Sequence, residues 1–101
     1  MSFYVIADED TVLGFRYAGV PGASVGDAAS AREAFEGVLA SRQYDLIILT
    51  EPVADLMRDE VTRVRFESQG PVVVEVPGPK GPSPNRQDLM KLIQEAVGLK
   101  L

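Results

Sequence analysis

Candidate strands alternate with helical segments along the chain, and this alternation limits the possible folds more than any other feature. The strands are expected at residues 3–7, 23–25, 44–49 and 71–77, the second of them brief enough to be only an edge. Short apolar runs are typical of strands buried on both faces of a sheet. Since each run precedes a segment with helical periodicity, the order β-α-β-α-β-α-β-α favours a parallel sheet with right-handed crossovers. We therefore predict an α/β domain with a four-stranded parallel sheet in the order 2-1-3-4 and helices on both faces.

The first two helices have clear boundary signals. Acids and a threonine at residues 8–11 can cap a helix that Gly19 ends. Asp27 is expected to cap a second helix that runs to about Arg42, with Gly37 inside it. Because a glycine within a helix costs about 1 kcal/mol relative to alanine, we expect close packing at Gly37.

A third helix and a proline-rich connector follow. Pro52 stands in the first turn of one helix that carries apolar residues through Val64 and ends at Gln69. Four prolines lie within residues 77–84, so we expect a stiff, extended connector there. The predicted organisation is a sheet domain at 1–77, a linker at 78–84 and a C-terminal helix with its tail at 85–101.

The composition leaves few groups for catalysis. The 101 residues include no Cys and no His, which excludes disulfides, thiolate nucleophiles, imidazole bases and the usual zinc ligands. The net charge of −5 argues against nucleic acid as a partner, because binding phosphates needs a basic patch. No apolar run approaches the roughly 20 residues of a membrane span, so no direct membrane insertion is expected. The absence of Cys and of a basic N-terminal region favours the cytoplasm.

Polar residues follow the strands at the edge where α/β proteins usually bind ligands. They are Asp8, Glu9 and Asp10 after the first strand, Thr50 and Glu51 after the third, and residues 78–80 after the fourth. This Rossmann-like layout resembles response-regulator receivers, in which an acidic pair binds magnesium beside a phosphorylated aspartate. Thr50 stands at that acceptor position, and no fifth strand supplies the receiver's lysine. We therefore interpret the acids as a capped helix start and predict no catalytic residue and no metal site.

Nucleotide and cofactor binding are not expected either. No Gly-x-Gly-x-x-Gly follows the first strand, and carboxylates there would repel a pyrophosphate. Residues 78–83 lack the Walker spacing, and their prolines remove N–H groups that a phosphate loop needs. A small hydrolase that uses the acids at residues 8–10 is a further alternative, although no cleft is expected in a domain of this size.

The last helical segment has an apolar face that suits binding. Burying it on a partner would contribute several kcal/mol, at about 25 cal/mol per Å². The sequence leaves open whether this face packs on its own sheet or docks elsewhere. The candidate interface residues are Leu89, Ile93, Val97, Leu99 and Leu101.

Several segments resemble, in the right order, the F subunit of the archaeal-type and vacuolar-type (A/V-type) rotary ATPases. The first segment spans residues 5–20 and combines a strand, an acid-rich turn and Gly14-Phe15-Arg16 with Ala18-Gly19 close behind. The others are residues 45–54, 71–77 and 96–101, together with the Gly81-Pro82 pair.

This resemblance implies a non-catalytic subunit of the central stalk of a V/A-type ATP synthase, cytoplasmic and peripheral to the membrane. Such a protein would bind the long coiled-coil D subunit of the stalk, rotate inside the catalytic headpiece, and contact other stalk or headpiece subunits. Its C-terminal helix would reach toward the headpiece and modulate ATP hydrolysis or synthesis, which is coupled to proton or sodium transport. The alternative is a degenerate receiver-like signalling domain without the acceptor aspartate.

Overall fold

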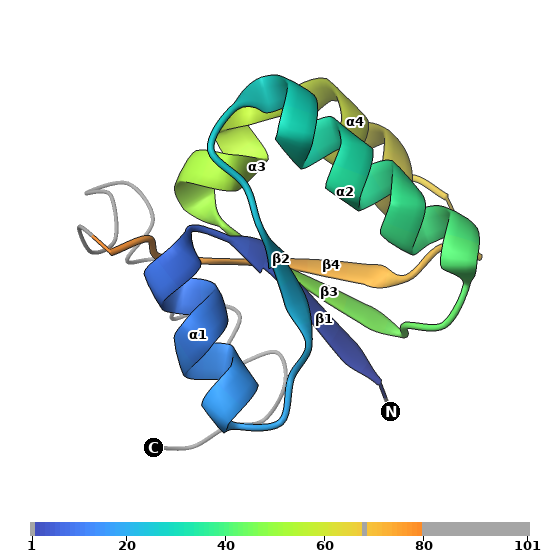
Figure 1. The fold of residues 1–101 in the computed structure, drawn as a ribbon. Coiled ribbons are helices and arrows are strands. Elements are labelled where there is room, and N and C mark those ends of the chain that lie inside the picture. The colour runs from blue at the N-terminus through green and yellow to red at the C-terminus, as the bar shows by residue number, and fades with distance from the viewer. Residues whose placement is uncertain (1, 68, 80–101) are drawn as a thin grey trace, which may run out of the picture.

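The computed structural model describes residues 2–67 and 69–79 (Figure 1). The elements are β1 (Phe3–Ala7), α1 (Glu9–Tyr17), β2 (Gly22–Ser24), α2 (Ala28–Ser41), β3 (Leu46–Thr50), α3 (Glu51–Leu56), α4 (Arg58–Arg65) and β4 (Val72–Val76). The strand boundaries differ from the predicted ones by two residues at most. The C-terminal helix predicted at 85–101, most of the linker predicted at 78–84 and all five candidate interface residues lie outside the described residues.

The strands form one sheet in the order β2-β1-β3-β4, and every neighbouring pair is parallel. This confirms the predicted fold class and strand order. β1 and β3 lie at the centre, where their alternate side chains point to opposite faces. The register pairs Val5 with Ile48 and Ile48 with Val74, so these side chains form a row across one face.

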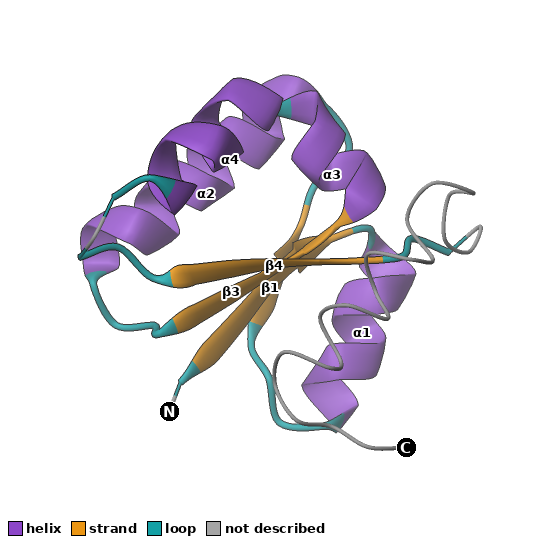
Figure 2. Cartoon of the chain, turned by 180° about the vertical axis from the view of Figure 1, so that it is seen from behind, coloured by secondary structure: helices purple, strands orange, loops and turns teal. Residues whose placement is uncertain are grey.

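Helices cover both faces of the sheet, as predicted (Figures 1 and 2). Of the described helices, only α1 packs on the first face, where its Val12 joins a small buried cluster with Val5 and Ile48. The helices α2, α3 and α4 pack on the other face around a larger cluster. The largest fully buried side chains of that cluster are Phe35, Ile6, Ile47, Leu49 and Met57.

The predicted third helix is wrong as a single element, because the chain bends at Met57. This residue has φ −140° and ψ 44°, outside the helical region, and it separates α3 from α4. Its side chain is fully buried in the larger cluster. The bend lets Ala54 before it and Val61 after it both face the core, and α4 ends at Arg65 instead of reaching Gln69.

The expected close packing at Gly37 is also wrong, since no heavy atom lies within 4 Å of the position that a Cβ would occupy there. Gly37 instead borders a shallow cavity of about 500 Å³ between α2 and β2. The close approach occurs at Gly22 in β2. A Cβ there would overlap Val5 Cγ1 and would lie 2.5 Å from the carbonyl oxygen of Val5.

Gly22→Ala is therefore expected to lower the free energy of unfolding by roughly 3 kcal/mol, because the Val5 carbonyl belongs to a central strand and cannot move aside. Urea unfolding of the two proteins would measure this difference. Gly26→Ala is the matched control, because the space around Gly26 is open. Equal losses for the two variants would contradict the close approach of β2 to β1.

Candidate functional site

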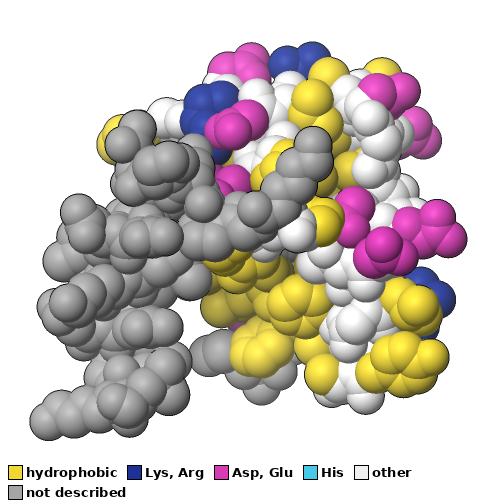
Figure 3. Space-filling view, turned by 90° about the vertical axis from the view of Figure 1, so that its left-hand side faces the viewer, with side chains coloured by type: hydrophobic (Ala, Val, Ile, Leu, Met, Phe, Trp, Pro, Cys, Tyr) yellow, Lys and Arg dark blue, Asp and Glu magenta, His cyan; other side chains and the backbone are white. Residues whose placement is uncertain are grey.

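The carboxyl edge of the sheet carries the polar residues that the sequence singled out. Thr50 and Glu51, at the end of β3 and the start of α3, are 1% and 7% exposed, so the fold buries both. Glu9 and Asp10 lie exposed on the first turn of α1. In Figure 3, acidic side chains reach the surface above an area of hydrophobic side chains. Lys80 lies outside the described residues.

Asp8 is the N-cap of α1, as predicted. One carboxylate oxygen accepts a hydrogen bond from the Thr11 N–H at 3.0 Å, and the other accepts one from the Thr11 hydroxyl at 2.6 Å. Burial would raise the pKa of the Asp8 carboxyl, but the hydrogen bonds from Thr11 outweigh it and lower this pKa below its usual value. Asp8 is therefore already engaged in holding the helix start.

The acids at this edge do not converge on a common point. Within the described ranges, no group of three or more acidic side chains is placed to hold a metal ion. Thr50, which stands where a receiver carries its acceptor aspartate, is buried at the end of β3. The edge thus places a helix cap and two buried polar residues where a receiver has its phosphorylation site.

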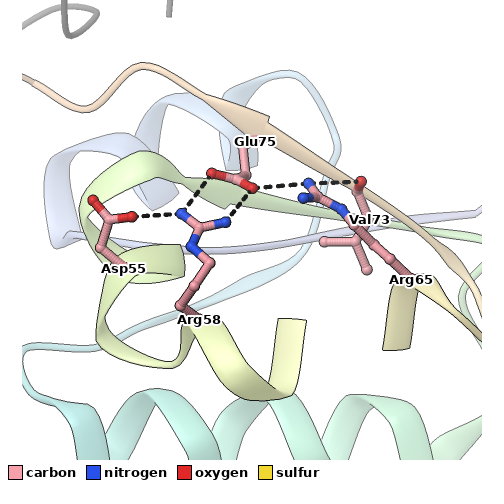
Figure 4. A network of polar contacts seen from close by, with 5 residues as sticks. All are labelled: Asp55, Arg58, Arg65, Val73 and Glu75. Carbon is pink, nitrogen blue, oxygen red and sulfur yellow. Dashed lines mark hydrogen bonds and ion pairs between the residues drawn. The ribbon is translucent and has the colours of Figure 1, made fainter. Parts of the chain in front are cut away.

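An ion-pair network around the buried Glu75 of β4 is the main polar feature that the sequence did not predict (Figure 4). Glu75 is 6% exposed, and Arg58 binds its two carboxylate oxygens at 2.6 and 2.9 Å. The Arg65 Nη2 lies 2.8 Å from one of these oxygens and 3.5 Å from the carbonyl oxygen of Val73. Asp55 also contacts the Arg58 guanidinium.

This network is a clamp between the two helices α3 and α4 and the strand β4. Bidentate contacts between an arginine and a carboxylate are among the stronger hydrogen bonds in proteins. The hydrogen bonds to Glu75 raise the pKa of Arg58 against the opposing effect of burial, and Asp55 adds to the rise. Both guanidinium groups are turned to Glu75, so the clamp presents a satisfied ion-pair network and not an anion site.

The sequence contained a signal for this clamp. Glu75 interrupts a run of four valines, and strand alternation places it on the same face as the buried Val73. A carboxylate on a buried face requires a positive partner. Spacing alone could not identify that partner, because Arg58 lies 17 residues away.

The chain is thus a small parallel α/β protein that carries a helix cap and two buried polar residues at the carboxyl edge of its sheet. It matches the model of the ATP synthase (F/14-kDa) subunit family over residues 3–93. The chain belongs to this family, so it is a subunit of an ATP synthase, and other subunits of that complex are its partners.

Similar proteins support this placement over the whole length of the chain. One is the F subunit of the A-type ATP synthase of Methanococcus maripaludis, 35% identical over 103 residues that cover 100% of this chain and 99% of that protein. Another is the F subunit of the A-type ATP synthase of Methanothermobacter thermautotrophicus, 32% identical over 98 residues, covering 96% and 92%. None of the helices formed by residues 2–67 and 69–79 could span a membrane.

Asp8→Asn is expected to make the free energy of unfolding depend less strongly on pH in the acidic range. Folding lowers the pKa of Asp8, so as the pH falls the Asp8 carboxylate is protonated in the unfolded chain before it is protonated in the folded one. The stabilisation that the charged carboxylate provides above about pH 4 is therefore lost as the pH falls further. Asparagine keeps a capping oxygen but no charge, so wild type should exceed the variant by about 0.5–1 kcal/mol at pH 7. Urea unfolding between pH 7 and 2 should show this difference shrinking, and a constant difference would contradict the assignment. Asp10→Asn, which leaves both Thr11 hydrogen bonds in place, is the control.

Glu75→Gln is expected to destabilise the protein by about 1–3 kcal/mol, because it leaves Arg58 and Arg65 facing a neutral group. The loss stays below that of a fully buried pair, since the arginine side chains are 38% and 42% exposed and can reach water. Thermal unfolding monitored by circular dichroism measures it. Glu67→Gln breaks the exposed pair with Arg63 and should change stability by less than about 0.5 kcal/mol. Equal effects of the two substitutions would show that the clamp adds nothing.

Proposed function

We propose that the chain is a non-catalytic subunit of the central stalk of an A-type ATP synthase and that it binds the coiled-coil D subunit of that stalk. The family match over residues 3–93 is the observation that carries this proposal. The carboxyl edge supports it, because Asp8 and Glu75 are tied to Thr11, Arg58 and Arg65 inside the fold. Because these carboxylates are bound within the fold, they are not available for catalysis, and this supports a role in binding other subunits.

The C-terminal segment acts in this proposal as the element that regulates the enzyme. Its helix at 85–101 reaches the catalytic headpiece and modulates ATP hydrolysis or synthesis, and through it proton or sodium transport. The contact residues on its apolar face are Leu89, Ile93, Val97, Leu99 and Leu101. The protein works in the cytoplasm, peripheral to the membrane, as part of the assembled complex.

The structure offers a firm base for such a segment at the end of β4. The clamp on Glu75 fixes this strand to α3 and α4. Two residues after the strand, a Cβ at Gly78 would lie 3.0 Å from two ring carbons of Pro52, so the chain leaves the sheet against the start of α3. A fixed point of departure lets a short linker set the direction of the segment beyond it.

Reconstitution with the coiled-coil stalk subunit and the headpiece tests this proposal. The full chain should co-elute with the purified coiled-coil subunit in size-exclusion chromatography, and deletion of residues 84–101 should change the ATP hydrolysis rate of the assembled complex severalfold. The truncated protein should still unfold cooperatively, because the described core clusters lie within residues 4–76. A full-length variant with Leu89, Ile93 and Val97 changed to serine separates the loss of the apolar face from the loss of chain.

Two results would contradict the proposal. Failure of the full chain to bind the coiled-coil subunit would remove the stalk assignment. Unchanged hydrolysis with both variants would remove the regulatory role of the C-terminal segment while leaving the stalk assignment in place.

A further inference from the structure

The outward face of α1 carries large apolar side chains that the fold leaves at the surface. Leu13 and Tyr17 lie one turn apart and are 46% and 83% exposed, whereas Val12 on the inward face is 4% exposed. With Asp10 and Gly14 they occupy positions i, i+3, i+4 and i+7 of one helix face. We call these four residues the α1 stripe. Figure 3 shows hydrophobic side chains gathered below acidic ones on this side of the molecule.

Gly14 lies in the middle of the stripe, and no contact or backbone conformation of the described residues requires a glycine there. Within residues 2–67 and 69–79, positive φ occurs at Gly19 and Arg42 and not at Gly14. No heavy atom lies within 4 Å of the place where its Cβ would stand, so nothing described requires the missing side chain. Glycine nevertheless weakens a helix relative to alanine. A glycine on an outward helix face allows the backbone of another chain to approach closely.

The α1 stripe differs from the other exposed apolar positions. Among the helices that the structure describes, only α1 exposes two large apolar side chains one turn apart. Phe66, 86% exposed at the end of α4, lines a cavity of about 970 Å³ together with Val72 of β4, which is 61% exposed, but these two side chains come from different elements and form no helix face. Exposed apolar groups aligned along one helix face are the arrangement that suits a partner helix.

We propose that the α1 stripe docks one helix of the coiled-coil stalk subunit, which crosses α1 over Gly14. This inference rests on the proposed function and adds the face on which the partner binds. Spacing of i, i+3, i+4 and i+7 is the pattern by which a helix meets another helix. Tyrosine, as at Tyr17, is enriched among the residues that dominate binding energy, because a large flat ring loses little conformational entropy.

The charges at one end of the stripe define the partner further. Glu9 and Asp10 lie exposed on the first turn of α1, and none of the ion pairs among the described residues involves either of them. The docked helix therefore carries lysine or arginine where it passes this turn. It presents apolar side chains to Leu13 and Tyr17 and its backbone to Gly14.

The sharpest test is a substitution that affects folding and binding in opposite directions. Gly14→Ala in the full chain should raise the melting temperature, because alanine favours the helix and the space is open. The same variant should bind the purified coiled-coil subunit about tenfold more weakly, because the methyl group holds the docked helix's backbone away. Gly37→Ala is the matched control. Gly37 lies within α2, and the space around it is equally open. The Gly37→Ala variant should therefore have a raised melting temperature and an unchanged affinity for the coiled-coil subunit.

A second pair of variants tests the apolar side chains, again by titration calorimetry with the coiled-coil subunit. Tyr17→Ser should weaken binding at least about tenfold, and Phe66→Ser, which removes an equally exposed ring, should leave it unchanged.

If wild type binds the coiled-coil subunit and both Gly14→Ala and Tyr17→Ser bind it equally well, this face is not the docking site and the stalk assignment stands. If wild type does not bind at all, the proposed function itself fails. A wild-type dimer in sedimentation that Gly14→Ala dissociates, with binding of the coiled-coil subunit unchanged, would assign the α1 stripe to a second copy of the chain.

Discussion

A parallel sheet must be covered on both faces, and most of this structure follows from that requirement. The central strands β1 and β3 bury Val5, Ile6 and Ile47 completely on opposite faces, so a single layer of helices would leave one set of these side chains in water. The right-handed crossovers send α1 to one face and α2 to α4 to the other. The division is unequal, and the larger cluster accounts for the bend at Met57, which turns two short helices toward one core.

The same burial makes Glu75 the most demanding polar residue of the described core. A carboxylate on the inner face of β4 is costly unless a positive partner with good geometry faces it. Arg58 and Arg65 supply that geometry from both ends of α4, and Asp55 balances part of the excess positive charge. The charge of Glu75 is thus neutralised inside the fold. The clamp holds β4 to α3 and α4 and leaves the Glu75 carboxylate little capacity to bind a ligand.

Features that depend on local chemistry could be predicted from the sequence, and features that depend on distant partners could not. The strand order follows from periodicity and crossover handedness, and the caps at Asp8 and Asp27 follow from side chains next to the N–H groups they bind. The bend at Met57 has no glycine or proline to mark it, because burial of one side chain causes it. Close packing was expected at Gly37 but occurs at Gly22, for a related reason: only the neighbouring strand or helix decides whether a glycine is crowded.

The two faces of the sheet also differ in the surface they leave available to a partner. The helices α2, α3 and α4 contact one another, and Arg32 of α2 forms ion pairs with Asp59 and Glu60 of α4, so much of their surface is already engaged. Among the described helices, α1 contacts the sheet and no other helix to a comparable extent, and its Leu13 and Tyr17 are exposed on the outward side. A partner helix can therefore cover this side without disturbing the buried contacts of Val12. Gly14 weakens α1 on this outward side, away from the buried contacts of Val12, so a docking face there costs the core little.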